Sequence, residues 1–392
     1  MNILFFYRVY PNYGGVEVVT SVLARRFVHD GHHVTIASLE QLHPEIKEQN
    51  IDGVELISLH YPMLSKDNIV KLHKTLTQNK IDILINQWGL PFNSTRLCRK
   101  AIKGTKCRLV SVLHGAPNTS KVIIKAKDKV KNAKNFLSRG FYQAVLFFKE
   151  EVIKASIRYN VKHNERYIML SDSFIPSLIN YADLKTTKKI ISIGNPITIP
   201  IDLTGFDLSE KKKQVLYVGR MDFENKRVNR IVGVWEDISS RYIDWELVLV
   251  GDGPHKQKLM DYVTRNKIER VRFEGFQIEP PVKYYKEASI FMLTSDLEGF
   301  GLVITESMSF GCVPIVYGSY EAVYDIIDDG VCGFITPVPY SKGKTIKRLE
   351  WLITHNDERK NMAASAMKKA QQFTLDSIVK KWYEVLEDVC HR

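Results

Sequence analysis

The sequence predicts an α/β protein of two domains, each built on a doubly wound parallel sheet. The first observation is length, because 392 residues exceed what a single hydrophobic core usually holds. The second is the alternation of short apolar runs with helical runs along the whole chain, which is typical of parallel sheets covered by helices. The third is a composition of 44% hydrophobic and 26% charged residues, which is that of an ordinary globular protein.

Short apolar runs expected as strands occur in both halves of the chain, so each half can form its own sheet. In the first half they cover residues 2–7, 33–38, 83–86, 108–113 and 167–170, and in the second half residues 214–218, 245–250, 271–274, 290–293, 313–316 and 333–336.

The expected domain order is an N-terminal domain over residues 1–195, a linker over 196–213, a C-terminal domain over 214–372 and a final helix over 373–392. The linker is inferred from the prolines, the glycine and the terminal run of charges between Asn195 and Lys213. Residues 375–386 have helical apolar spacing. Open parallel sheets bind ligands at the carboxyl ends of their strands, so a ligand cleft facing both domains is expected.

Composition excludes several classes of protein. The five cysteines are scattered and form no C-x-x-C pair, which favours free thiols in a reducing compartment and argues against zinc. The first apolar run is too short for a signal-peptide core, and no run approaches the ~18 apolar residues of a transmembrane helix. We therefore expect a cytoplasmic protein, soluble or peripheral on the inner face of a membrane.

The net charge of +12 is concentrated in residues 119–166. This segment holds twelve Lys or Arg against four Asp or Glu, and it also carries several apolar runs. Helices with one basic and one apolar face would suit the surface of an anionic membrane. A solvated basic face over ordinary core helices is equally compatible with the pattern. Nucleic acid is ranked last because no nucleic-acid-binding motif is visible.

The most informative motif is residues 296–306, DLEGFGLVITE, in which Glu298 and Glu306 flank a glycine turn. An apolar strand precedes the turn and a helix follows it at Leu302-Val303, so backbone N–H groups at the helix start can bind a phosphate. Carboxylates do not bind phosphate but accept hydrogen bonds from hydroxyl groups. A nucleotide-sugar offers hydroxyls on both sides of its diphosphate. Taken alone, this stretch is explained equally well without a ligand, if one glutamate interacts with the helix dipole and the other is a solvated helix residue.

Other strand ends carry candidate ligand contacts, although tight turns or exposed basic loops would explain most of them taken singly. Gly14-Gly15 opens a helix without the G-x-G-x-x-G pattern, which counts against NAD or FAD. Gly219-Arg220 and Lys226 follow a strand and could hold a diphosphate. His114 and the pair Gly275-Phe276 also stand at strand ends.

These motifs in this order resemble the family-4 retaining glycosyltransferases of GT-B fold, most closely those that build bacterial capsular, exopolysaccharide or lipopolysaccharide chains. The motifs are Gly14-Gly15, His114-Gly115, Gly219-Arg220, Lys226, Gly251–Pro254, Gly275, Ser295, Glu298–Glu306 and Gly311–Pro314. The resemblance covers nearly the whole chain. Thr294 departs from it, because a proline is common at that position.

The resemblance implies a role for each candidate. Arg220 and Lys226 would neutralise the donor diphosphate, aided by the N–H groups of Gly15, Leu302 and Val303. Glu306 would accept from the ribose, Glu298 and His114 would face the donor sugar, and the backbone at Gly275 and Phe276 would meet the base. Substrate contacts are also expected from Gly14, Gly219, Gly299, Phe300 and Gly301.

The predicted activity is metal-independent transfer of a hexose from a nucleotide-sugar, expected to be a UDP-sugar, to a hydroxyl of a saccharide or lipid-linked saccharide, without a cofactor. No Asp-x-Asp motif is present, and Asp296-Leu-Glu298 is the nearest mimic. A sugar-nucleotide 2-epimerase and a non-catalytic glycosyltransferase-like partner subunit are the alternatives.

Overall fold

A computed structural model describes residues 1–46 and 49–391 of the chain. Residues 47, 48 and 392, which fall within the expected N-terminal domain and final helix, lie outside the described residues, as does the side chain of Lys121. The chain forms two compact units. Unit 1 is Met1–Asn195 together with the chain from Ile378 onward, and unit 2 is Pro196–Ser377.

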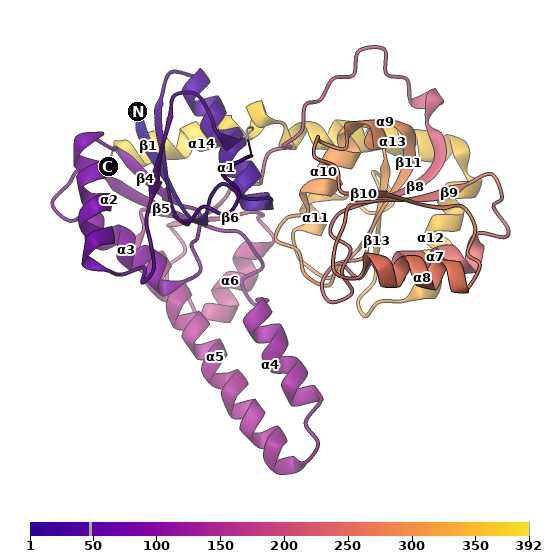
Figure 1. The fold of residues 1–392 in the computed structure, drawn as a ribbon, viewed down its shortest axis with the longest axis horizontal. Helices are drawn as coiled ribbons and strands as arrows, with labels where there is room; N and C mark the ends of the chain where they lie inside the picture. Colours follow the sequence, from indigo (N-terminus) through magenta and orange to yellow (C-terminus); the bar gives the residue numbers. More distant parts are fainter. Residues whose placement is uncertain (47–48, 392) are drawn as a thin grey trace. The chain divides into compact units, whose positions relative to one another are not determined.

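Unit 1 contains a parallel sheet of seven strands in the order β3-β2-β1-β4-β5-β6-β7. The strands are β1 (Asn2–Val9), β2 (His33–Glu40), β3 (Val54–Ser58), β4 (Ile83–Asn86), β5 (Arg108–Leu113), β6 (Arg166–Met169) and β7 (Ile190–Ser192). The helices of this unit are α1 (Gly15–His29), α2 (Lys66–Gln78), α3 (Phe92–Ile102), α4 (Lys121–Lys131), α5 (Phe136–His163) and α6 (Phe174–Ala182) (Figure 1).

Unit 2 contains a parallel sheet of six strands in the order β10-β9-β8-β11-β12-β13. The strands are β8 (Lys212–Val218), β9 (Glu246–Val250), β10 (Val271–Gly275), β11 (Ala288–Leu293), β12 (Val313–Tyr317) and β13 (Phe334–Thr336). The helices are α7 (Val228–Ile238), α8 (Lys256–Arg265), α9 (Val282–Glu287), α10 (Leu302–Ser309), α11 (Val323–Ile326), α12 (Lys342–Thr354) and α13 (Asn356–Ala370).

The two doubly wound parallel sheets confirm the predicted fold class, and every predicted strand is present within two residues of its expected ends. The sequence pattern missed β3 and β7. Both are edge strands, and β3 has mostly solvent-accessible side chains. Edge strands lack the continuous apolar run of a strand covered on both faces, so their pattern is weak.

Residues 196–213, expected as a linker, lie in unit 2 and include a short 3₁₀ helix at Leu208–Glu210. At the other end of unit 2, a 3₁₀ helix at Gln371–Phe373 leads into α14 (Leu375–Cys390). From Ile378 onward α14 belongs to unit 1, where Tyr383 donates a 2.6 Å hydrogen bond to Asp30 and Arg166 pairs with Asp388. The buried face of α14 carries Ile378, Val379, Trp382, Leu386 and Val389.

Strand order determines which loops are neighbours. In unit 2 the order reverses between β8 and β11, which are paired, so the loops that follow these two strands lie side by side at the carboxyl edge of the sheet. In unit 1 the reversal falls between β1 and β4, and β5 lies beside β4. These edges are the expected ligand-binding positions of open parallel sheets.

Candidate functional site

The loop after β8 is shaped by a buried carboxylate that the sequence analysis did not single out. Asp222 Oδ1 accepts hydrogen bonds from the backbone N–H groups of Asn225 at 2.7 Å and Lys226 at 2.9 Å. Asn225 in turn accepts at its carbonyl from the N–H of Asp296 at 2.7 Å, which ties this loop to the loop after β11. The backbone of Lys226 is therefore held in place by Asp222, independently of the lysine side chain.

Lys226 and Glu298, both predicted site residues, are in direct contact. The ammonium Nζ of Lys226 lies 2.5 Å from Oε1 of Glu298, and their side chains are 26% and 11% exposed. Lys226, predicted to bind the diphosphate, and Glu298, predicted to bind the attached sugar, therefore lie together in one largely buried site. Arg220 lies on the same loop with an exposed side chain, and no ion pair of its guanidinium is found among the described residues.

Asp296 is held by two arginines and is therefore a structural anchor. Its carboxylate accepts from Arg227 Nε and from Arg230 Nη1, each at 2.5 Å. Arg230 also donates to the carbonyl of Thr294 at 3.0 Å and stacks 4.4 Å from the ring centroid of Tyr340. Charge-assisted pairs of this kind stabilise a defined geometry.

Thr294, the position at which a proline is common in the family, contributes to the same anchor. Its hydroxyl donates to the carbonyl of Arg227 at 3.0 Å. A proline has no side-chain donor, so this departure from the family pattern supplies an additional tie between the two loops.

The turn between the two glutamates ends at Gly301, which has φ of +90° and immediately precedes α10. A Cβ at this position would lie 2.7 Å from the hydroxyl of Tyr320, so glycine is required by both conformation and space. The first N–H groups of α10, at Leu302 and Val303, have no acceptor within the helix, as at any helix start. The ring of Phe300 is buried, and its centroid lies 5.6 Å from the ring centroid of Phe373. Phe300 and its neighbour Gly299 can therefore offer a ligand only backbone groups.

Glu306 is buried in unit 2, and both of its oxygens accept from hydroxyl groups. Thr198 donates to Oε1 at 2.7 Å and Tyr285 donates to Oε2 at 3.1 Å. Burial raises the pKa of Glu306, and these two hydrogen bonds oppose that shift. A carboxylate oxygen can accept more than one hydrogen bond, so Glu306 retains capacity for a further hydroxyl.

Gly275 and Phe276 lie at the carboxyl end of β10. The carbonyl of Gly275 accepts from the N–H of Gly251 at 2.8 Å, and the side chain of Phe276 is 54% exposed. Gly219 is joined to the same edge through its N–H, which donates to the carbonyl of Val250 at 3.0 Å. The strand ends that carry the predicted base contacts and cations therefore share one edge of the sheet of unit 2.

In unit 1, α1 begins at Gly15 with Gly14 as its N-cap. The carboxylate of Glu17 folds back to this end, where it accepts from Asn12 Nδ2 at 2.8 Å. A Cβ on Gly14 would lie 2.1 Å from that carboxylate, and burial raises the pKa of Glu17. A carboxylate of the chain itself thus occupies the helix start at which a phosphate contact was predicted.

His114, after β5, is in contact with Gln87, after the neighbouring strand β4. His114 Nε2 lies 2.5 Å from Gln87 Oε1. Gln87 is 1% exposed, and among the described residues neither its Nε2 nor His114 Nδ1 has a hydrogen-bond partner. Burial lowers the pKa of His114 to about 3, so the imidazole is neutral near pH 7.

Sequence reasoning missed the partners of the predicted residues, which are Asp222, Thr198, Tyr285 and Gln87. Gln87 carries the same signal as His114, a polar residue directly after an apolar strand, and could have been found by it. Thr198 and Tyr285 had no such signal, because their role depends on how distant segments pack around Glu306.

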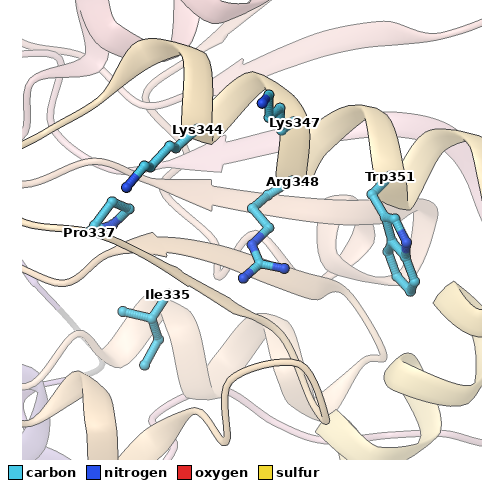
Figure 2. A pocket seen from close by; sticks show the side chains of 6 residues that line it. All are labelled: Ile335, Pro337, Lys344, Lys347, Arg348 and Trp351. Carbon is cyan, nitrogen blue, oxygen red and sulfur yellow. The ribbon is translucent and has the colours of Figure 1, made fainter.

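A separate hollow in unit 2 lies between β13 and α12 and contains none of the predicted site residues. Figure 2 shows the side chains of Lys344, Arg348 and Trp351 extending from α12 toward the segment that carries Ile335 and Pro337. Arg348 Nη2 lies 3.8 Å from Asp329 Oδ2, and its guanidinium stacks 4.3 Å from the ring centroid of Phe334. These contacts account for Arg348 without a ligand.

The described residues contain neither a cluster of metal-binding side chains nor a helix suited to span a membrane. No group of three or more His, Cys, Asp or Glu side chains is arranged to hold a metal ion within residues 1–46 and 49–391. In the same part of the chain, no helix has the length and apolar character needed to cross a bilayer.

Two family models match the chain over consecutive segments. The model for glycosyl transferases group 1 matches residues 203–369, and the model for glycosyltransferase family 4 matches residues 13–181. Together they cover most of both units.

Individual relatives agree with these models. The chain is 23% identical to the N-acetyl-alpha-D-glucosaminyl L-malate synthase of Bacillus anthracis, over 97% of this chain and 96% of that protein. Among solved structures, the lipopolysaccharide outer core galactosyltransferase WaaB in its apo form has a TM-score of 0.72 at 20% identity and covers 99% of each chain. HepE of Anabaena, solved with UDP and glucose, has a TM-score of 0.74 at 17% identity and covers 99% of this chain and 100% of that one.

The structural neighbours show a shared fold, and the two family models, matched one after the other along the chain, show the family. The sequence-based identification, which depended on the ordered set of motifs from Gly14-Gly15 to Gly311–Pro314, is confirmed at the level of the family. The chain belongs to the family-4 glycosyltransferases and is a retaining glycosyltransferase of GT-B fold.

Proposed function

We propose that this enzyme transfers a hexose-type sugar from a UDP-sugar to a hydroxyl of a saccharide or lipid-linked saccharide in surface polysaccharide synthesis. The observation that carries this proposal is the contact between Lys226 and Glu298, 2.5 Å apart at the switch point of the unit 2 sheet. In a nucleotide-sugar the anomeric carbon is bonded directly to the diphosphate. A cation for the phosphate and a carboxylate for the sugar must therefore be close neighbours, as these two groups are.

The residues around this contact supply the other functions that the donor needs. Arg220 and the N-terminus of α10 at Leu302-Val303 would bind the diphosphate oxygens, because both present positive charge or free N–H groups. Glu306 would accept a hydrogen bond from the ribose, and the backbone at Gly275 and Phe276 would meet the base. Gly14, Gly15, Gly219 and Gly299–Gly301 are proposed to allow close backbone approach.

Chemically, the bond between the anomeric carbon and the diphosphate oxygen breaks, and its electron pair stays on the departing UDP. The acceptor oxygen forms the new bond on the same face of the sugar, and its proton passes to a phosphate oxygen. Negative charge therefore develops on the leaving group, where Arg220, Lys226 and the helix start would stabilise the transition state. In this scheme Glu298 and His114 position the sugar and are not nucleophiles.

UDP is proposed because it occurs with glucose in the related HepE structure, and a polysaccharide acceptor because WaaB acts on lipopolysaccharide outer core. A small organic acid is the competing acceptor class to test, because one relative is named N-acetyl-alpha-D-glucosaminyl L-malate synthase. Donor and acceptor are therefore best identified separately.

The first test is a screen of UDP- and GDP-sugars for slow hydrolysis by the purified enzyme, followed by acceptor addition. We expect one UDP-hexose to release UDP slowly and an oligosaccharide acceptor to accelerate the release. Malate as the better acceptor would contradict the polysaccharide assignment, and preference for a GDP-sugar would contradict the UDP assignment.

The two alternatives predict different outcomes in the same assay. A sugar-nucleotide 2-epimerase would convert the donor without any acceptor, and NMR of the recovered sugar would detect the inverted carbon. A non-catalytic partner subunit would bind UDP without turnover of any donor. The charged residues Arg220, Lys226, Glu298 and Glu306 are all present, which favours an active transferase.

A further inference from the structure

Unit 1 carries a helical hairpin over residues 121–155, formed by α4, a short loop and the first part of α5. Figure 1 shows the two helices running side by side away from the sheet of unit 1. Only the last part of α5 is buried against that unit, through Ser156, Ile157, Asn160 and Val161. Ser156 and Asn160 both donate to the carbonyl of Leu90, which fixes the base of the hairpin.

The outer part of α5 carries a face of large apolar side chains that nothing in the described chain covers. Leu137, Phe141, Phe148 and Val152 recur at helical spacing and are 82%, 66%, 69% and 52% exposed. Phe136 and Phe147 lie on the adjoining face and are 87% and 66% exposed. Soluble proteins rarely expose a contiguous apolar patch of this kind, and such patches mark an interaction surface.

The packing of α4 does not account for these side chains. It packs along a different side of α5: Ile123 and Ala126 of α4 are buried, and Val145 and Leu146 of α5 are half-buried. The first part of α5 is thus apolar both toward α4 and away from it. A helix that is apolar on both sides is normally covered on both sides.

The charge around the tip of the hairpin is of one sign. Between Asp128 and Glu150 the sequence contains no acidic residue but five cations, which are Lys129, Lys131, Lys134, Arg139 and Lys149. Lys134 and Arg139 flank the tip residues Phe136 and Leu137. Long basic side chains can lie along apolar surface while their charged ends reach toward anions. This arrangement complements a surface that is apolar inside and anionic outside.

We propose that the hairpin tip docks on an anionic membrane surface, with Phe136, Leu137 and Phe141 inserted at the boundary of the acyl chains and the surrounding cations on lipid phosphates. An interfacial helix of this type needs an apolar face together with lysine and arginine, both of which are present. A second copy of the hairpin tip is a poorer occupant, because the five cations between Asp128 and Glu150 would face their own copies, and that stretch contains no acidic residue. This proposal does not depend on the identity of the donor or acceptor.

The test uses the full-length protein and vesicles of phosphatidylcholine, with or without phosphatidylglycerol. We expect sedimentation with the anionic vesicles at low salt and release at high salt, because the electrostatic part is screened. A triple variant Phe136→Ser, Leu137→Ser, Phe141→Ser is expected to bind about tenfold more weakly or worse. Its turnover with a water-soluble acceptor should be unchanged, since these exposed residues do not contribute to either sheet.

The matched control replaces two equally exposed apolar residues of unit 2, Ile243→Ser and Ile278→Ser, which are 74% and 83% exposed. A Phe136→Trp variant adds a direct readout, because its fluorescence should shift to the blue and be quenched by brominated lipid only with anionic vesicles. Absence of sedimentation of the wild-type protein with anionic vesicles would overturn the proposal. An equal loss of vesicle binding in the control variant would overturn it as well. A wild-type dimer that the triple variant converts to a monomer, without vesicle binding, would assign the surface to a second copy instead.

Discussion

The ammonium group of Lys226 lies 2.5 Å from the carboxylate of Glu298, and this contact joins the loop after β8 to the loop after β11. The loops are neighbours because β8 and β11 are paired at the point where the strand order of unit 2 reverses. Without a ligand, each group neutralises the other. A diphosphate that binds to Lys226 must therefore compete with Glu298, which has consequences for both side chains.

Replacing Lys226 by alanine should reduce kcat/KM for sugar transfer by about 100-fold, because one positive donor to the leaving diphosphate is lost. The loop should keep its shape, since Asp222 holds the backbone of this residue and not its side chain. The measurement is initial-rate UDP release, with circular dichroism to verify folding. Lys342→Ala, which removes a 2.8 Å pair with Asp237 elsewhere in unit 2, is the matched control and should retain full activity. Retained activity in the Lys226 variant would argue against the proposed transferase site.

Replacing Glu298 by glutamine should separate binding of UDP from turnover of the UDP-sugar. Loss of the carboxylate frees Lys226 from its competing partner, so we expect UDP alone to bind as tightly as before or more tightly. Turnover should fall, because a neutral amide accepts hydrogen bonds from sugar hydroxyls less strongly than a carboxylate does. Isothermal calorimetry with UDP and rate measurements with the donor provide the two readouts. Weaker binding of UDP would contradict the competition between Glu298 and phosphate.

Replacing Gly301 by alanine tests whether glycine is required at this turn for its positive φ or for the lack of space for a Cβ atom. The variant should lose about 2 kcal/mol of stability, since it combines φ of +90° with a Cβ 2.7 Å from the Tyr320 hydroxyl. Gly330→Ala, at φ of +79° with no atom near the added Cβ, should lose only about 1 kcal/mol and serves as the control for backbone strain. Urea unfolding measures both.

The Tyr320 hydroxyl is buried and has no hydrogen-bond partner within the described part of the chain. Tyr320→Phe should therefore be tolerated, and in the Gly301→Ala background it should recover part of the lost stability by removing the clashing oxygen. Equal losses at Gly301 and Gly330 would show that space is not limiting at the turn.

The sequence was sufficient for the parts of this protein that depend on local pattern. Buried strands appear as apolar runs, and the turn from Glu298 to Gly301 appears as glycines between a strand and a helix. It was insufficient where the environment comes from distant residues. That Lys226 and Glu298 are in contact, that Asp296 is held by Arg227 and Arg230, and that Glu306 is enclosed by Thr198 and Tyr285 are results of tertiary packing. No spacing along the chain encodes such pairs.

Glu306 should give the protein a measurable pH dependence of stability. Burial raises the pKa of Glu306 in the folded state above the usual value of about 4.5, which applies to the unfolded state. At pH values between the unfolded-state pKa and the folded-state pKa, the folded state therefore binds more protons at this site than the unfolded state. The contribution of Glu306 to the free energy of unfolding therefore falls as pH rises through that window and is constant above it. Glu306→Gln removes this dependence. The difference between the urea unfolding curves of wild type and Glu306→Gln, measured at several pH values, should show it.

The same variant should weaken donor use, because the glutamine amide group cannot accept from both hydroxyls and a ribose. We expect a raised KM for the UDP-sugar. An unchanged KM together with the predicted stability difference would make Glu306 a purely structural residue, which would remove it from the proposed site without affecting Lys226.

Gln87 and His114 allow the protonation state of the proposed sugar contact to be changed by design. Burial lowers the pKa of His114 to about 3, so its neutral form stabilises the folded state fully above pH ~6.5 and progressively less as pH falls toward 3. Activity should accordingly show no inflection from this imidazole near neutral pH. Gln87→Glu places a carboxylate 2.5 Å from Nε2, which should raise the pKa of His114 and create an inflection in the pH–rate profile. Gln87→Met, of similar length and uncharged, is the control and should not create one. The same inflection in a Gln87→Glu, His114→Ala double variant would show that another group titrates.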